Sequence, residues 1–438
     1  VNAGADNDTI NVGDTSSVVD NIGAALTVNA EAGSDTLNVD DSGDGTVNDG
    51  VLTGSMITGL DMAVGITYGT LETLNIDLGS AGDSFTIAST HAGATNLATF
   101  GGADTVNVQS IAGATTINSG ADNDTITISN ASSGVDNIGA ALTVLGDAGS
   151  DTLNVDDSAD TTADSGALTS GAISGLGTAS AISYSTLETL NIDLGSASDT
   201  FAIESTHAGA TNLNSLGGAD TINVLSIAGA TTVNSGTDND TINVGDTSSV
   251  VDDIGAALTV EGDTGLDTLN VDDSGDTTIN SGVLTSDTIS GLGMLSGITY
   301  GTLETLNIDL GSAGDTLTIE STHVGATNLN TFGGADTVNV QSIAGATTIN
   351  GGAENDTFSI GDASGLVDNI SAALTVNGEA GSDALNVDDS GDATVSSGSL
   401  TANSITGLDM ASGITYGTLE AVNIDLGSAG DTFTITST

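Results

Sequence analysis

The sequence predicts an all-β fold, a right-handed parallel β-helix (β-solenoid) built from tandem modules. Three observations support this prediction. A long segment repeats at a fixed period, apolar side chains alternate with polar ones, and Gly and Asp punctuate a chain that contains no Pro. No segment combines a helical period with helix-capping signals.

The repeat has a period of 116 residues. The segment Leu71–Gly79 returns at Leu187 and Leu303, and in altered form at Leu419. The period predicts four solenoid modules, residues 1–116, 117–232 and 233–348 and a partial fourth, residues 349–438. Both ends fall inside a repeat, so we expect the chain to be part of a longer array.

A finer period lies inside each module. Turn aspartates stand at Asp8, Asp35, Asp83, Asp104 and Asp124, with gaps of 27, 48, 21 and 20 residues. If the gap of 48 residues spans two turns, each module has about five coils. We therefore expect residues 116 apart to lie on the same face of the solenoid.

The strands show a period of two. After Asp35, Leu37 and Val39 are expected to point inward, while Thr36 and Asn38 face outward. The same alternation follows Asp83 and Asp104. The expected core of the first module contains Leu37, Val39, Phe85, Ile87, Val106 and Val108.

The composition limits the partners of the chain. It has 59 acidic residues and no Lys or Arg, which gives a formal net charge of −59. Nucleic acids and anionic membranes are therefore not expected as partners, because both are bound mainly through Lys and Arg. A disordered chain is disfavoured, since 37% of the residues are hydrophobic and they alternate regularly.

The acidic residues are mostly Asp in Gly-rich turns, and stacking coils brings equivalent carboxylates about 5 Å apart. Their repulsion along the stack favours a divalent cation, and Ca²⁺ suits carboxylate and carbonyl oxygens in flexible turns. An alternative is that Asp only caps these turns and holds no ion.

The candidate ligands form three groups. The turn group is Asp6, Asp8, Asp35, Asp83, Asp104, Asp122, Asp124, Asp151, Asp199, Asp220, Asp238, Asp240, Asp267, Asp315, Asp336, Asp356, Asp383 and Asp431. The loop group is Asp40, Asp41 and Asp44 with the copies Asp156, Asp157, Asp160, Asp272, Asp273, Asp276, Asp388, Asp389 and Asp392. The third group ends a strand in each module, at Asp77, Asp193, Asp309 and Asp425.

Two segments carry a resemblance to a known family. Gly101–Val108 and Gly217–Ile222 resemble degenerate RTX, or haemolysin-type, calcium repeats, and the whole module is similar to repeats of giant secreted bacterial proteins of adhesin type. The resemblance implies calcium binding and an extracellular or cell-surface location. Because the motif occurs about once per coil here, we expect a calcium column along one edge only.

These observations predict a structural role: an extracellular, calcium-stabilised stalk, filament or adhesin fibre, able to associate with copies of itself. An enzyme is not expected. His91, His207 and His323 occupy one repeat position, too far apart to converge, and are expected to be solvated corner residues.

Other functions stay open. Outward Thr ladders allow an ice-binding or carbohydrate-binding surface, and a polysaccharide-active enzyme is a weaker alternative. The Asn7-Asp8-Thr9 triplet and its copies are formal glycosylation acceptors, so the sequence also allows surface glycans.

Overall fold

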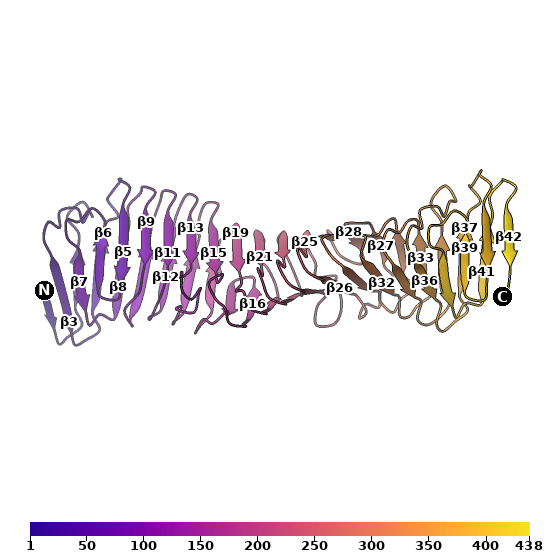
Figure 1. The fold of residues 1–438 in the computed structure, drawn as a ribbon. Helices are drawn as coiled ribbons and strands as arrows, with labels where there is room; N and C mark the ends of the chain where they lie inside the picture. The colour runs from indigo at the N-terminus through magenta and orange to yellow at the C-terminus, as the bar shows by residue number, and fades with distance from the viewer. The chain divides into compact units, whose positions relative to one another are not determined.

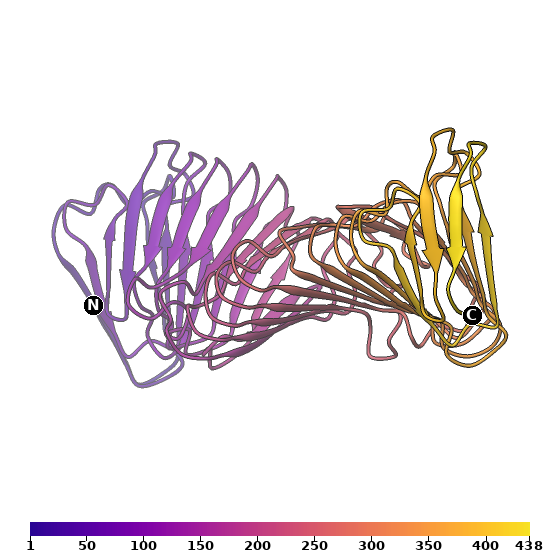
Figure 2. The ribbon, with the colours of Figure 1, turned by 45° about the vertical axis from the view of Figure 1, so that its right-hand side comes forward.

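A computed structural model describes residues 1–438, and every regular element in it is a β-strand. The chain divides into two compact units, Val1–Gly218 and Ala219–Thr438, which are described separately. Figures 1 and 2 show the strands of each unit stacked side by side in two sheets. No helix long and apolar enough to span a membrane is present.

Unit 1 contains two sheets. Sheet 1A consists of β1 (Asn2–Gly4), β3 (Leu26–Glu31), β5 (Asp49–Thr53), β6 (Met56–Gly59), β7 (Ile66–Gly69), β9 (Ser84–Ile87), β11 (Thr105–Val108), β13 (Thr125–Ile128), β15 (Thr152–Asp156), β19 (Thr189–Asp193) and β21 (Ala210–Asn214). Sheet 1B consists of β2 (Thr9–Val12), β4 (Thr36–Asp40), β8 (Thr73–Asp77), β10 (Ala94–Ala98), β12 (Thr115–Asn118), β14 (Leu142–Leu145), β16 (Ser165–Thr169), β17 (Ala172–Gly175), β18 (Ile182–Ser185) and β20 (Thr200–Ile203).

Unit 2 has the same construction. Sheet 2A consists of β23 (Thr231–Asn234), β25 (Leu258–Glu261), β27 (Ser281–Leu284), β28 (Thr288–Gly291), β29 (Ile298–Gly301), β31 (Thr316–Ile319), β33 (Thr337–Val340), β35 (Thr357–Ile360), β37 (Ala384–Asp388) and β41 (Ala421–Asp425). Sheet 2B consists of β22 (Thr221–Val224), β24 (Thr241–Val244), β26 (Thr268–Asp272), β30 (Thr305–Asp309), β32 (Ala326–Asn330), β34 (Thr347–Asn350), β36 (Leu374–Asn377), β38 (Ser397–Leu400), β39 (Ser404–Gly407), β40 (Ile414–Gly417) and β42 (Thr432–Ile435).

Within each unit the chain passes alternately through the two sheets, and successive passes pair in parallel. Thr105 of β11 aligns with Thr125 of β13, which aligns with Thr152 of β15. Most strands bury every second side chain between the sheets, as β11 and β13 do and as the period of two predicts. The six predicted core residues are all buried, none more than 1% exposed. The prediction of an all-β parallel β-helix is confirmed.

One hairpin in each module departs from the parallel pattern. β5, β6 and β7 pair antiparallel within sheet 1A, with Leu52 opposite Ile57 and Ile57 opposite Ile66. β5 then pairs in parallel with β9, where Gly50 lies beneath the ring of Phe85. A Cβ at Gly50 would lie 2.4 Å from Phe85 Cδ2, so this strand accepts only glycine at that position.

The hairpin explains why one prediction is wrong. From β2 to β12 a module makes nine passes: β2, β3, β4, the β5–β7 hairpin, β8, β9, β10, β11 and β12. Nine passes are four and a half coils, not five, so the next module begins in the opposite sheet. β4 lies in sheet 1B and its copy β15 in sheet 1A, and in unit 2 β26 lies in sheet 2B and its copy β37 in sheet 2A. Residues 116 apart therefore lie on opposite faces.

The gap of 48 residues was the source of the error. Between Asp35 and Asp83 the chain makes only three passes, because the antiparallel hairpin uses residues without advancing around the coil. Asp35 and Asp83 consequently lie at opposite corners of unit 1. The predicted module boundaries themselves stay a prediction.

Candidate metal centre

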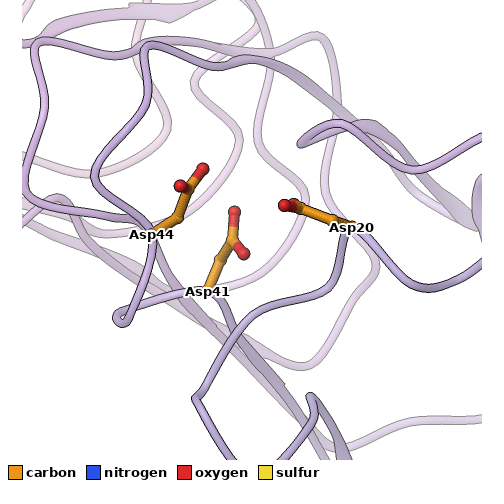
Figure 3. A group of neighbouring side chains, drawn as sticks. All are labelled: Asp20, Asp41 and Asp44. Atoms are coloured by element: carbon orange, nitrogen blue, oxygen red, sulfur yellow. The ribbon is translucent and has the colours of Figure 1, made fainter.

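The clearest carboxylate cluster lies at a corner of unit 1 where the chain passes from sheet 1B to sheet 1A. Residues 13–25 connect β2 to β3 and residues 41–48 connect β4 to β5, so these two loops are stacked. They bring Asp20, Asp41 and Asp44 together, with one carboxylate oxygen of each within 4.8 Å of the others (Figure 3). Asp41 is fully buried and Asp44 is 7% exposed, while Asp20 lies on the surface.

Neutral donors hold two of these carboxylates in place. The Val19 N–H donates to Asp41 Oδ1 at 2.9 Å, and the Thr46 hydroxyl donates to Asp44 Oδ2 at 2.8 Å. The side-chain amide of Asn48 donates to Asp44 Oδ2 at 2.6 Å, while the buried Asn48 Oδ1 has no hydrogen-bond partner. The cluster therefore contains three carboxylates, all hard oxygen ligands, and the Asn48 amide nitrogen lies against two of them.

The carboxylates differ in pKa. Burial, followed by repulsion from Asp44 and Asp20, raises the pKa of Asp41 to about 6, although the Val19 N–H opposes the shift. Burial also acts to raise the pKa of Asp44, but hydrogen bonds from Thr46 and Asn48 outweigh it and the pKa falls. Burial disfavours the charged form of Asp41, whereas Asp44 beside it stays ionised. A bound cation would stabilise the charged form of both carboxylates.

The cluster recurs at the next 116-residue step. Its second copy in unit 1 joins Asp136, Asp160 and Asp164, again with oxygens within 4.8 Å. In unit 2 the equivalent aspartates also repel one another. Asp276 and Asp252 act on Asp273, while Asp392 and Asp368 act on Asp389. Burial is the leading cause that raises the pKa of Asp157 and Asp273 to about 7 and that of Asp389 to about 6. Asp389 is fully buried, and neither carboxylate oxygen has a hydrogen-bond partner.

The loop group of candidates is thus only partly brought together. Asp41, Asp44 and Asp160 join clusters, whereas Asp40 and Asp156 end strands and accept hydrogen bonds from Ser42 and Ser158. The sequence did not single out Asp20 and its copies Asp136, Asp252 and Asp368 as candidates. It also did not single out Asn48 or its copy Asp164. The 116-residue recurrence of Asp20 was the one available signal.

The turn group forms hydrogen-bonded columns. In unit 1 the backbone N–H of Asp83 donates to Asp104 Oδ1 at 2.7 Å, that of Asp104 to Asp124 Oδ1 at 2.8 Å, and that of Asp124 to Asp151 Oδ1 at 2.9 Å. The Asp151 N–H ends the column on Glu188 Oε2 at 2.8 Å. We call a row of this kind a corner column.

Corner columns stand at both corners of each unit. Unit 1 has Asn48, Asp83, Asp104, Asp124, Asp151 and Glu188 at one corner, and at the other Asp8, Asp35 and Glu72 in one row and Asp164 and Asp199 in a second. Unit 2 has Asn280, Asp315, Asp336, Asp356, Asp383 and Glu420 at one corner, and at the other Asp220, Asp240, Asp267 and Glu304 in one row and Ser396 and Asp431 in a second. Carboxylate columns therefore stand at both corners, because a module of four and a half coils moves the column to the other corner; a calcium column along one edge stays a prediction.

The remaining candidates lie on the outer surface. Asp6, Asp122 and Asp238 are exposed turn residues, and Asp122 Oδ2 accepts the Gly102 N–H at 3.1 Å. The strand-end residues pair across neighbouring strands, as Asp40 with Asp77, Asp156 with Asp193, Asp272 with Asp309 and Asp388 with Asp425. Asp40 and Asp77 border an open groove of about 320 Å³ with Asn11 and Asn38.

The three histidines are only partly exposed, rather than solvated corner residues as expected. Each is half-buried, and the rings of His91 and Tyr68 meet edge to face with centroids 5.8 Å apart. His207 with Tyr184 and His323 with Tyr300 repeat this contact. Burial lowers the pKa of all three imidazoles, so they are neutral packing residues at pH 7.

Comparisons with known proteins give little beyond this geometry. No family model matches the chain, and no curated protein matches it. Among solved structures, the chain is similar to a hyperactive, Ca²⁺-dependent, β-helical antifreeze protein from an Antarctic bacterium, with 17% identity over 88% of this chain and 84% of that chain. The TM-score is 0.17, so the fold assignment depends on the strand pairing described above.

Proposed function

We propose that this chain is a structural repeat region of an extracellular stalk, filament or adhesin fibre, and that calcium at the loop clusters stabilises it. One observation carries the proposal: two clusters that contain a buried carboxylate lie 116 residues apart in unit 1, and the equivalent aspartates repel one another in unit 2, in a chain that has no Lys or Arg. Nothing within the chain offsets this negative charge, so an external cation is needed.

Calcium suits the clusters better than magnesium. The ligands are carboxylate oxygens on flexible loops, and Ca²⁺ accepts six to eight such oxygens in irregular geometry, whereas Mg²⁺ requires a tight octahedron and retains its waters. Extracellular millimolar calcium would fill such sites, which supports a location outside the cell.

Repetition supports a structural role over catalysis. Each chemically distinctive group, including the His–Tyr pair, occurs once per module at an equivalent position. The histidine Nε2 atoms are buried away from solvent, and the tyrosine hydroxyl of Tyr68 donates to the Thr53 carbonyl. We therefore propose no enzymatic activity.

The test is circular dichroism of the full chain, titrated from chelator into millimolar calcium, with magnesium as the control. The expected result is a gain in β-signal and a higher melting temperature with calcium, and a much smaller gain with magnesium. A melting temperature in chelator equal to that in calcium would contradict the proposal and leave the aspartates as turn formers.

Ice binding is a second candidate, because sheet 1A carries an uncharged regular array. Across β9, β11, β13, β15 and β19, one row contains Ser84, Thr105, Thr125, Thr152 and Thr189, and the next contains Thr86, Asn107, Thr127, Asn154 and Asn191. The Asn191 amide donates to Asn154 Oδ1 at 2.7 Å, which fixes these side chains. Rows about 7 Å apart, with strands about 4.8 Å apart, form a flat lattice of hydroxyls and amides.

The array is tested with the calcium-loaded protein. Replacing Thr125 and Thr152 together by Leu should abolish any thermal hysteresis, because two bulky side chains break the plane of hydroxyls. Ser132→Leu, at an exposed loop residue outside the array, is the matched control. Absence of hysteresis in the unaltered chain would end this candidate and leave the structural role untouched.

A further inference from the structure

A half-exposed phenylalanine borders a groove on unit 2 whose residues belong neither to a loop cluster nor to a corner column. Phe85, Phe201 and Phe358 are fully buried, whereas the side chain of Phe332 is 47% exposed. The groove has a volume of about 490 Å³ and is lined by Asn330, Phe332, Asn350, Gly352, Ala353 and Glu379. This volume falls within the range of about 300–1,000 Å³ that is typical of small-molecule sites.

Three neighbouring strands of sheet 2B bring the groove together. β32, β34 and β36 pair in parallel and in register, with Asn330 opposite Asn350. Phe332, Gly352 and Glu379 each follow the last residue of their strand by two positions, and the coils stay in register there. These three residues therefore stand in one row across adjacent coils, with the aromatic ring and the carboxylate on either side of a glycine.

Gly352 keeps the space between the ring and the carboxylate open. Its φ is +86°, and a Cβ at this position would collide with the carbonyl oxygen of Phe332. Only glycine suits a left-handed backbone that passes so close to a neighbouring coil. No side chain from this position can therefore fill the floor of the groove.

The backbone holds Phe332 in a conformation that costs free energy. Its φ is +59°, in the left-handed region that bulky residues rarely adopt, and its carbonyl accepts the Ala353 N–H at 2.7 Å. The same repeat position is occupied by Phe100 and Leu216, which are also left-handed and partly exposed. A strained residue that leaves its apolar side chain half in solvent indicates a role at the surface.

The polar groups of the groove include both donors and acceptors. Nδ2 of Asn350 donates to Asn330 Oδ1 at 2.9 Å, and Nδ2 of Asn330 donates to Asp309 Oδ1 at 2.6 Å. Each carboxamide has two N–H groups, so a second N–H on each amide remains for a ligand. Glu379 is exposed and adds two acceptor oxygens, while its backbone N–H donates to the Thr418 hydroxyl at 2.7 Å.

We propose that this groove binds a neutral hexopyranose of a glycan, with the C–H face of the sugar on Phe332 and its hydroxyls on Glu379 and the two asparagine amides. A hydroxyl both donates and accepts, so it can use the amide N–H groups as well as the carboxylate. A cationic ligand would suit the ring and the carboxylate but offer no acceptor to the amides. An anionic sugar is disfavoured by Glu379 and by the net charge of −59.

This binding goes beyond the structural role proposed above and does not need calcium at the loop clusters. Phe332→Gly separates the two, because glycine accepts the left-handed backbone while the ring is lost. The variant should therefore keep or raise the melting temperature of the full chain in calcium. A loss of the calcium response would concern the clusters, whereas a loss of sugar binding at an unchanged melting temperature concerns the groove.

Sugar binding is measured by saturation-transfer NMR with methyl α-mannopyranoside, methyl β-galactopyranoside and cellotetraose as the probes. Every chain carries Phe100→Gly, so that the equivalent ring of unit 1 is absent. We expect at least one of these neutral sugars to bind, and Phe332→Gly to lower its affinity by about tenfold. Val324→Ala removes an exposed apolar side chain outside the groove and should leave the affinity unchanged.

Glu379→Gln tests the class of ligand. Its amide oxygen still accepts from a hydroxyl, so the affinity for the sugar should fall by about fivefold or less. Nα-acetyl-arginine amide serves as the cationic probe and should bind more weakly than the sugar. Stronger binding of the cationic probe, abolished by Glu379→Gln, would overturn the proposal in favour of a cationic partner.

Two further results would overturn the proposal. One is that none of the three sugars binds the chain with Phe332 in place. The other is an equal sugar affinity with and without the Phe332 ring. Phe332→Trp keeps the test valid if the glycine variant fails to fold, because a larger ring at the same place should hold or increase the affinity, and a loss of binding there also contradicts the stacking.

Discussion

The loop clusters and the corner columns place the same side chain at the same corner in two different environments. In the cluster, Asp44 receives hydrogen bonds from Thr46 and Asn48, and its pKa is lowered. In the column, Asp124 receives one backbone N–H, and its pKa is raised. Burial acts to raise the pKa of both carboxyls, and hydrogen-bond donors outweigh it only at Asp44.

The comparison shows how a chain without cationic side chains can stack its carboxylates. Where three of them converge near the surface, as at Asp20, Asp41 and Asp44, a divalent ion can enter and bind. Where they are stacked singly inside the corner, one oxygen of each carboxylate accepts a backbone N–H, as Asp124 Oδ1 does from Asp104. The following predictions test this division between clusters and columns.

The largest effect should come from the cluster. Replacing the buried aspartate at the repeat position of Asp41 in all four modules, by Asp41→Asn, Asp157→Asn, Asp273→Asn and Asp389→Asn together, should remove most of the stabilisation that calcium gives. Each site filled at a hundredfold excess over Kd contributes about 2.7 kcal/mol, so four sites are a large share of the stability of a solenoid. The measurement is the melting temperature in calcium minus that in chelator.

The matched control for this prediction replaces four column residues, Asp104, Asp124, Asp240 and Asp336, by Asn. It removes the same number of charges and should leave the calcium-dependent difference in melting temperature nearly intact. If both quadruple variants lose the calcium response equally, the division between clusters and columns is wrong.

A smaller effect is expected from a natural difference between modules. The second cluster has the carboxylate of Asp164 at the position where the first has the amide of Asn48. Burial, followed by interaction with Asp160, raises the pKa of Asp164 to about 6. Calcium should therefore bind this cluster more tightly at pH 8 than at pH 5.5, because Asp164 must lose its proton first.

Exchanging the two residues tests this directly. Asn48→Asp should increase the calcium affinity of the first cluster several-fold at pH 8, and Asp164→Asn should reduce that of the second by a similar factor. Calorimetric titration at the two pH values measures both. Equal affinities in the exchanged and natural chains would mean that position 48 and its copy do not contact the ion.

The fold could be predicted further than the site. Alternation in segments such as Thr36–Val39 gave the strands and their buried faces, because a period of two follows directly from strand geometry. The half-coil shift between modules could not be predicted, since nothing in residues 49–69 distinguishes an antiparallel hairpin from two ordinary passes without knowing the partners of β5 and β7.

The site depended on that same missing information. Asp41 and Asp44 stood out as a dense acidic loop, but Asp20 is a lone aspartate in residues 13–25 and carries no motif of its own. Only the stacking of the β2–β3 loop on the β4–β5 loop brings it into the cluster.

The smallest effect concerns the histidines, which border neither a cluster nor the interior of a column. His91 lies against Tyr68, Glu72 acts on it, and its Nδ1 is 3.5 Å from the Thr95 hydroxyl. His91→Ala should lower the free energy of unfolding by about 1 kcal/mol, the range of an edge-to-face aromatic pair. His91→Phe keeps a ring there and should recover part of that loss. Denaturant unfolding measures both, and calcium affinity should not change in either variant, because the imidazole is neutral and at the opposite corner from the Asp41 cluster. A fall in calcium affinity on His91→Ala would show that the corners are coupled and that the carboxylates do not act alone.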